Sequence, residues 1–166
     1  MAERQERTAP DAVLTRIGQV VMLHHAGDRE EARRRLLDLW TEIGAHGQPL
    51  HRCTLAHYLA DTQDDPSDEL AWDLRALSAA DEAEGAVGLR GFYPSLHLNL
   101  AADYVKLGRT EAARSHLHRA RGAAGVLGDD GYGDGVRAAI TRLELRLGDD
   151  GGPGGESWGP PRQRPS

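Results

Sequence analysis

Residues 95–121, SLHLNLAADYVKLGRTEAARSHLHRAR, carry the pattern that decides the fold. Apolar and small residues recur there at spacings of three and four on either side of Gly108, so each set shares one face of a helix. The small residues let the backbones of two facing helices approach closely, and the larger ones fill the space between helix pairs. The stretch therefore predicts two helices joined by a turn at Gly108. The residues concerned are Leu100, Ala101, Tyr104 and Leu107 in the first helix and Ala112, Ala113, Leu117 and Ala120 in the second.

Within this stretch, Asn99, Leu100 and Ala101 are followed by Tyr104, Gly108, Ala113, Leu117 and Ala120. In this order and spacing the residues resemble one unit of the tetratricopeptide repeat family, a helix–turn–helix of about 34 residues. Two positions depart from the family, because Ala101 replaces a usual glycine and His97 stands where tryptophan is common. The resemblance implies an all-α, TPR-like α-solenoid of right-handed helix–turn–helix repeats. Because the family is a scaffold that presents binding surfaces, it also implies protein or peptide binding rather than a particular reaction.

The same periodicity predicts five further helices, which complete three helix pairs and a C-terminal capping helix. They are expected at about 10–26, from 28 to the glycines at 44 and 47, and at about 49–62, 66–84 and 133–147. Gly27 should end the first of these helices, and Asp65 followed by Pro66 should cap the one that starts at 66. We predict a disordered N-terminus at 1–8, a TPR-like helical repeat domain at 9–147 and a disordered Gly/Pro-rich tail at 148–166.

Composition narrows the classes of function. The chain has 20 Lys and Arg against 26 Asp and Glu, a net charge of −6, and this balance argues against a nucleic-acid partner, which usually meets a basic face. The single cysteine, Cys53, cannot form an intrachain disulfide, as expected in a reducing compartment. No apolar run approaches the ~20 residues of a membrane span, and the N-terminus lacks the apolar segment of a signal peptide. We expect a soluble, cytoplasmic protein with no membrane partner.

The sequence contains none of the common motifs for catalysis or cofactor binding. No Gly-rich loop ends in Gly-Lys-Ser/Thr, and there is no Gly-x-Ser-x-Gly elbow. Residues 129–134, DDGYGD, lack the alternating ligands and the closing glutamate of a calcium loop. We therefore expect no cofactor and no catalytic activity.

In the resembled family, the first helix of each pair lines a concave groove. Carrying this over position by position gives a candidate binding surface of mixed apolar and polar side chains, which suits an extended or helical peptide segment. His57, Asp61, Asn99 and Lys106 should set its polarity. The candidates are Leu14, Ile17, Val21 and His24 from the first helix, Leu50, Cys53, His57 and Asp61 from the third, and Leu98, Asn99, Ala102 and Lys106 from the fifth.

Cys53, His57 and Asp61 lie four residues apart on one helical face and admit three interpretations. In the first, they are packing residues and Asp61 orients the imidazole of His57. In the second, they belong to the peptide-binding groove. In the third, Cys53 and His57 form a metal-binding or enzymatic site. A structural zinc there would need further ligands from other helices.

The sequence also bears on two other kinds of partner, a C-terminal carboxylate and a second copy of the chain. Chaperone-binding members of the resembled family clamp a C-terminal carboxylate with Lys and Asn side chains. Asn99 and Lys106 are present here, but Ile17 and Val21 occupy groove positions where that clamp has polar groups, so we do not expect this ligand. A self-associating scaffold stays an alternative, because low aromatic content and an exposed capping helix leave an apolar surface that a homodimer could cover.

Overall fold

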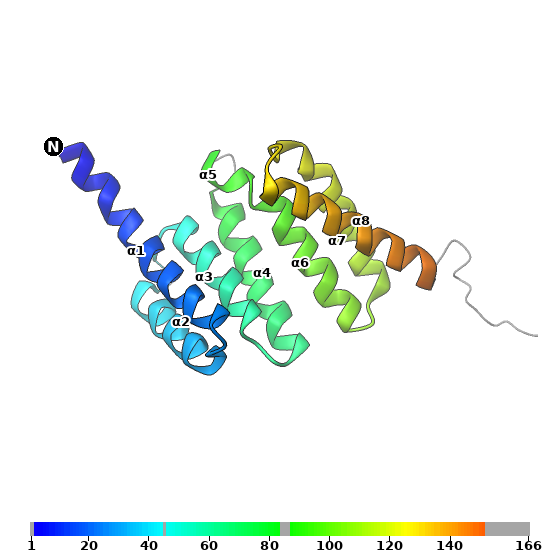
Figure 1. Cartoon of the computed structure of the whole chain (residues 1–166), viewed down its shortest axis with the longest axis horizontal. Coiled ribbons are helices and arrows are strands. Elements are labelled where there is room, and N and C mark those ends of the chain that lie inside the picture. Colours follow the sequence, from blue (N-terminus) through cyan, green and yellow to red (C-terminus); the bar gives the residue numbers. More distant parts are fainter. Residues whose placement is uncertain (1, 45, 84–86, 152–166) are drawn as a thin grey trace, which may run out of the picture. The chain divides into compact units, whose positions relative to one another are not determined.

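The computed structural model describes residues 2–44, 46–83 and 87–151, and all regular structure in this part of the chain is helical (Figure 1). The all-α class predicted from the sequence is therefore confirmed for the described residues. The elements are α1 (Ala2–His25), α2 (Arg29–Ile43), α3 (Pro49–Asp61), α4 (Pro66–Glu82), α5 (Val87–Arg90), α6 (Tyr93–Lys106), α7 (Thr110–Ala123), the 3-10 turn η1 (Ala124–Val126) and α8 (Gly131–Gly151).

Contacts divide the chain into two compact units, Met1–Leu89 (unit 1) and Arg90–Ser166 (unit 2). The sequence predicts a repeat domain over 9–147, and the division lies within that range. It falls within the connection where Gly85, Gly88 and Gly91 interrupt the helical pattern. Glycine lacks a side chain to pack and favours such interruptions.

Unit 1 contains two helical hairpins, α1 with α2 and α3 with α4, and α3 also packs on α1 and α2. The first turn uses Gly27, whose φ of +98° is a backbone conformation that favours glycine. The second ends at Asp65, whose side chain accepts a 2.8 Å hydrogen bond from the Ser67 N–H, with Pro66 as the first residue of α4. Both turns lie where the sequence predicts them.

The core of unit 1 is aliphatic at its centre and aromatic at its edge. The Trp40 and Trp72 rings meet edge to face, with centroids 5.1 Å apart, and join α2 to α4. Burial of these apolar side chains supplies most of the favourable free energy of packing. The buried members are Ile17, Val20, Ala32, Leu36, Leu39, Leu55 and Leu59, and Val13, Leu14, Val21, Trp40, Ile43, Tyr58 and Trp72 pack against them.

Unit 2 contains the hairpin of α6 and α7, with α8 packed against both helices. Gly108, with φ +75°, makes the hairpin turn as predicted. Ala101 and Ala113 are fully buried on α6 and α7, which allows the two helices to approach closely. One buried cluster of this unit contains Ala101, Ala113, Leu117, Ala120, Ala124, Val136, Ile140 and Leu147, and Leu98, Tyr104, Val105, Leu127 and Leu143 pack against it.

Helix ends differ most from prediction at the two extremes of the described chain. Helix α1 begins at Ala2, within the segment 1–8 that was expected to be disordered and before the expected start near residue 10. Residues 2–7, AERQER, are mostly strong helix formers, which accounts for the extension. Helix α8 runs to Gly151, past the expected start of the tail at 148. The rest of that predicted tail, 152–166, lies outside the described residues.

Candidate functional site

In unit 1, the predicted α1 residues mostly face the core. Ile17 is only 1% exposed, and Leu14 and Val21 are half-buried against the same cluster. These positions repeat every three or four residues, as a groove-lining face would, but that face packs into the buried cluster that also contains Leu36 of α2 and Leu55 of α3. Ile17 is therefore a core residue rather than a surface that a partner can contact. His24, at the end of the same helix, stays half-buried.

Cys53 is also a core residue. It is 0% exposed, and burial alone raises the pKa of its thiol to about 12. A metal ligand or a nucleophile needs the thiolate, and burial disfavours that form. Within the described part of unit 1, no three ligand atoms from His, Cys, Asp and Glu side chains lie within 4.8 Å of one another. Leu50, one turn before Cys53 on α3, is half-buried.

His57 and Asp61 form the polar end of α3. The half-buried His57 ring meets the Tyr58 ring edge-on, with centroids 5.0 Å apart. Burial lowers the pKa of His57, and the nearby Asp61 carboxylate opposes that shift. The pKa of the Asp61 carboxyl is raised, first because surrounding groups displace water from it, and the charge of His57 acts against this shift. The environment therefore favours the less charged form of each group.

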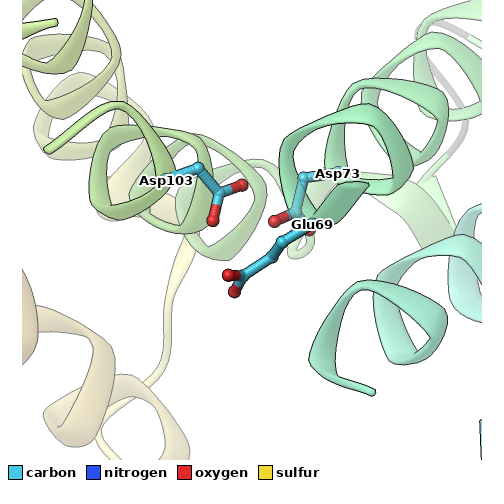
Figure 2. Close-up of side chains that lie close together, drawn as sticks. All are labelled: Glu69, Asp73 and Asp103. Atoms are coloured by element: carbon cyan, nitrogen blue, oxygen red, sulfur yellow. The ribbon is translucent and has the colours of Figure 1, made fainter. Parts of the chain in front are cut away.

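Two acidic residues of α4 were not predicted from the sequence. Figure 2 shows Glu69 and Asp73 on the same side of the helix, four residues apart, and Asp73 is 2% exposed. In unit 2, Asp103 of α6, also drawn in Figure 2, is 1% exposed. Periodicity analysis follows apolar residues, so an acid at a buried helical position gives no signal in it.

Unit 2 contains an open hollow between α6 and α8, with a volume of about 480 Å³. Three of the four predicted α6 residues line it, namely Leu98, Asn99 and Ala102; the fourth, Lys106, lies one turn further along α6 and is exposed. We call this hollow the α6/α8 hollow. Its complete lining is Leu98, Asn99, Ala102, Ala139, Arg142, Leu143 and Arg146.

The α8 side of the α6/α8 hollow was missed by sequence analysis. Ala139, Arg142, Leu143 and Arg146 follow the spacing i, i+3, i+4, i+7, so they share one helical face. That spacing was available in the sequence. The sequence analysis treats this helix only as a cap, so Arg142 and Arg146 are not among the predicted site residues.

Four stacked rings join α6 to α7. Centroid separations are 6.2 Å for Tyr93 and His97, 5.3 Å for His97 and His116, and 5.5 Å for His116 and Tyr104. The Nδ1 atoms of His97 and His116 are 3.0 Å apart, a hydrogen bond in which one ring donates and the other accepts. Burial lowers the pKa of His116, and the charge of Arg119 lowers it further, so the neutral imidazole that this bond requires is favoured.

Comparison of the chain with models of known protein families, with curated proteins and with solved structures finds no match. Among the helices of the described residues, none combines the length and the hydropathy that a membrane crossing requires.

Proposed function

We propose that this chain is a protein- or peptide-binding module of the tetratricopeptide type, without catalytic activity of its own, and that its partner binds in the α6/α8 hollow. The observation that carries the proposal is the lining of that hollow. Leu98, Asn99 and Ala102, which the family resemblance assigns to a binding groove, open together onto about 480 Å³ of accessible space. In unit 1, the corresponding face packs into the core.

Packing in unit 2 supports the repeat-type arrangement that the proposal assumes. The small residues Ala101, Ala113 and Ala120 are fully buried, and Leu117 is 4% exposed. These are the positions at which the resembled repeat places small and apolar side chains. The buried free thiol of Cys53 fits the reducing cytoplasmic compartment that we propose for the protein.

The chemistry of the hollow suits a peptide. Leu98, Ala102, Ala139 and Leu143 form an apolar floor on which a partner side chain would lose contact with water. Each 100 Å² of apolar surface buried there would contribute about 2.5 kcal/mol before the costs of ordering the peptide. Asn99 adds an amide that can donate and accept hydrogen bonds with a peptide backbone.

Selection from a displayed random-peptide library on the purified full chain tests this proposal. Ala139→Trp places a large ring in the hollow, whereas Ala138→Trp places the same ring on an exposed neighbouring position of α8. Peptides enriched on the unmodified chain should bind Ala139→Trp at least about tenfold more weakly, a loss of about 1.4 kcal/mol. They should bind Ala138→Trp with unchanged affinity.

Two results would contradict the proposal. The first is the absence of any enriched peptide sequence after repeated selection. The second is a set of peptides whose affinity is equal for Ala139→Trp and the unmodified chain, which would place their site elsewhere. Circular dichroism of both tryptophan variants checks that neither has lost helix content.

A further inference from the structure

We infer that the α6/α8 hollow recognises an acidic, partly apolar segment, whose side-chain carboxylates pair with Arg142 and Arg146 while an apolar side chain fills the hollow. This inference rests on the proposed function, because it names the chemistry of the partner for the same site. The observation that supports it is the charge around the hollow.

Arg142 and Arg146 are exposed, and neither makes an ion pair with any side chain that the structure describes. The described acidic residues of α8 are already engaged. Glu144 lies 2.7 Å from an Arg121 nitrogen, and Asp134 lies 2.9 Å from an Arg137 nitrogen. The two hollow-lining arginines therefore present positive charge beside an apolar floor.

In two other hollows of the described residues, the arginines already have partners within the fold. The hollow between α1 and α2 contains Arg16, which pairs with Glu42 at 2.9 Å, and Arg35, which pairs with Glu31 at 2.7 Å. In the hollow between α7 and α8, Arg114 donates to the backbone oxygen of Leu147 at 3.2 Å. Arginines in these places already have partners within the fold, so they are poorer recognition groups.

Spacing sets the form of the expected ligand. Arg142 and Arg146 are four residues apart, or about 6 Å along the helix axis. Two carboxylates can match that separation from alternate positions of an extended peptide, about 6.6 Å apart, or from positions one turn apart in a helix. Planar guanidinium groups can each form two parallel hydrogen bonds with a carboxylate. The chain's own segment 152–166 is a poor match, since it contains one Glu and two Arg.

Fluorescence anisotropy of labelled peptide pools on the full chain tests the inference. Three pools have equal length and the same leucine positions, and their remaining positions are Glu/Asp, Ser/Gln/Asn or Lys/Arg. The acidic pool should bind most tightly and the basic pool most weakly. The affinity of the acidic pool should fall as salt is added, because exposed charge pairs are screened beyond a Debye length of about 8 Å at physiological ionic strength.

Charge-reversal variants test whether Arg142 and Arg146 cause the preference for acidic peptides. Arg142→Glu or Arg146→Glu should weaken binding of the acidic pool by about five- to tenfold, since the change replaces an exposed attraction with a repulsion. Arg119→Glu is the matched control, because it makes the same change in net charge at an exposed position of α7 outside the hollow. Its effect should stay below about twofold.

The outcomes separate this inference from the proposed function. If the neutral or basic pool binds best and Ala139→Trp abolishes that binding, the peptide site stands and the acidic preference is wrong. Equal weakening by Arg119→Glu and Arg142→Glu would also overturn the preference, as it would show only a general charge effect. If no pool binds, both proposals fail. A chain that sediments as a dimer, and as a monomer when Ala139→Trp is introduced, would show a second copy in the hollow and overturn the peptide inference.

Discussion

In unit 1, Ile17 of α1 is 1% exposed and belongs to the same buried cluster as Leu55 and Leu59 of α3. In unit 2, Ala102 of α6 and Ala139 of α8 are short side chains that line a hollow of about 480 Å³. Both places lie between helices, and they differ in the size of their side chains. Short side chains therefore border open space in this hollow, whereas a branched aliphatic side chain completes the core of unit 1.

Truncating one side chain in the core of unit 1 and one in the hollow of unit 2 should distinguish the two places. The expected change in the free energy of unfolding is the largest among these predictions. Ile17→Ala should reduce the free energy of unfolding by about 2–5 kcal/mol, because it leaves a cavity in a closed core. Leu98→Ala should reduce it by less than about 2 kcal/mol, since the half-buried Leu98 borders open space. Urea unfolding followed by circular dichroism measures both.

Peptide affinity should depend more on Leu98 than on Ile17, the reverse of the order expected for stability. Leu98→Ala should weaken peptides selected on the unmodified chain, and the milder core variant Ile17→Val should leave their affinity unchanged while destabilising the fold by about 0.5–1.5 kcal/mol. Equal losses of binding in these two variants would erase the proposed difference between the faces.

The second prediction concerns the start of α8, which sets where one wall of the hollow lies. A Cβ at Gly133 would lie 2.2 Å from the Gly128 carbonyl oxygen, whereas one at Gly135 would meet nothing within 4 Å. Gly133→Ala should therefore lower the free energy of unfolding by about 1–3 kcal/mol through steric strain. Gly135→Ala should raise it by up to about 1 kcal/mol through helix propensity.

Peptide affinity extends this test to the hollow. Gly133→Ala should weaken binding, because relief of the clash moves the first turn of α8, and Gly135→Ala should not. The Gly133 N–H also donates a 2.8 Å hydrogen bond to Asp130, which ties the same turn together. Equal stability of the two alanine variants would contradict this account of how α8 begins.

The helical elements could be predicted from the sequence because their signals are local. Apolar spacing, Gly27, Gly108 and the Asp65 cap place helices and turns without knowledge of distant contacts. The division into two units could not be predicted in this way, since it depends on the sum of contacts between helices far apart in the sequence.

The candidate site was only partly predictable. The spacing that groups Leu14, Ile17 and Val21 is the same as that which groups Leu98 and Ala102, so periodicity cannot say which face stays open. That outcome depends on the neighbouring side chains, which are leucines in the cluster of Ile17 but include Ala139 beside Leu98 and Ala102. Arg142 and Arg146 were overlooked because the family resemblance does not extend to α8.

The smallest expected effect concerns pH, where the two units again differ. The folded-state pKa of His116 is lowered by burial and by Arg119, so the unfolded chain binds more protons at pH values between the folded value and the unfolded value of about 6.5. The stability associated with His116 is therefore fully present above about pH 6.5 and is lost as the pH falls toward the folded pKa. Its slope cannot exceed about 1.4 kcal/mol per pH unit, the limit for one proton.

The stability associated with His57 and Asp61 of unit 1 should depend on pH less simply. His57 also has a lowered pKa, but the pKa of its neighbour Asp61 is raised, and a raised carboxyl pKa makes stability fall with rising pH between its unfolded and folded values. The two shifts therefore act in opposite directions. Urea unfolding at a series of pH values from about 5 to 8 should show a flatter dependence in His116→Gln than in His57→Gln. If the two variants flatten the curve equally, the ring stack of unit 2 does not respond to protonation as its part-buried Nδ1–Nδ1 hydrogen bond requires.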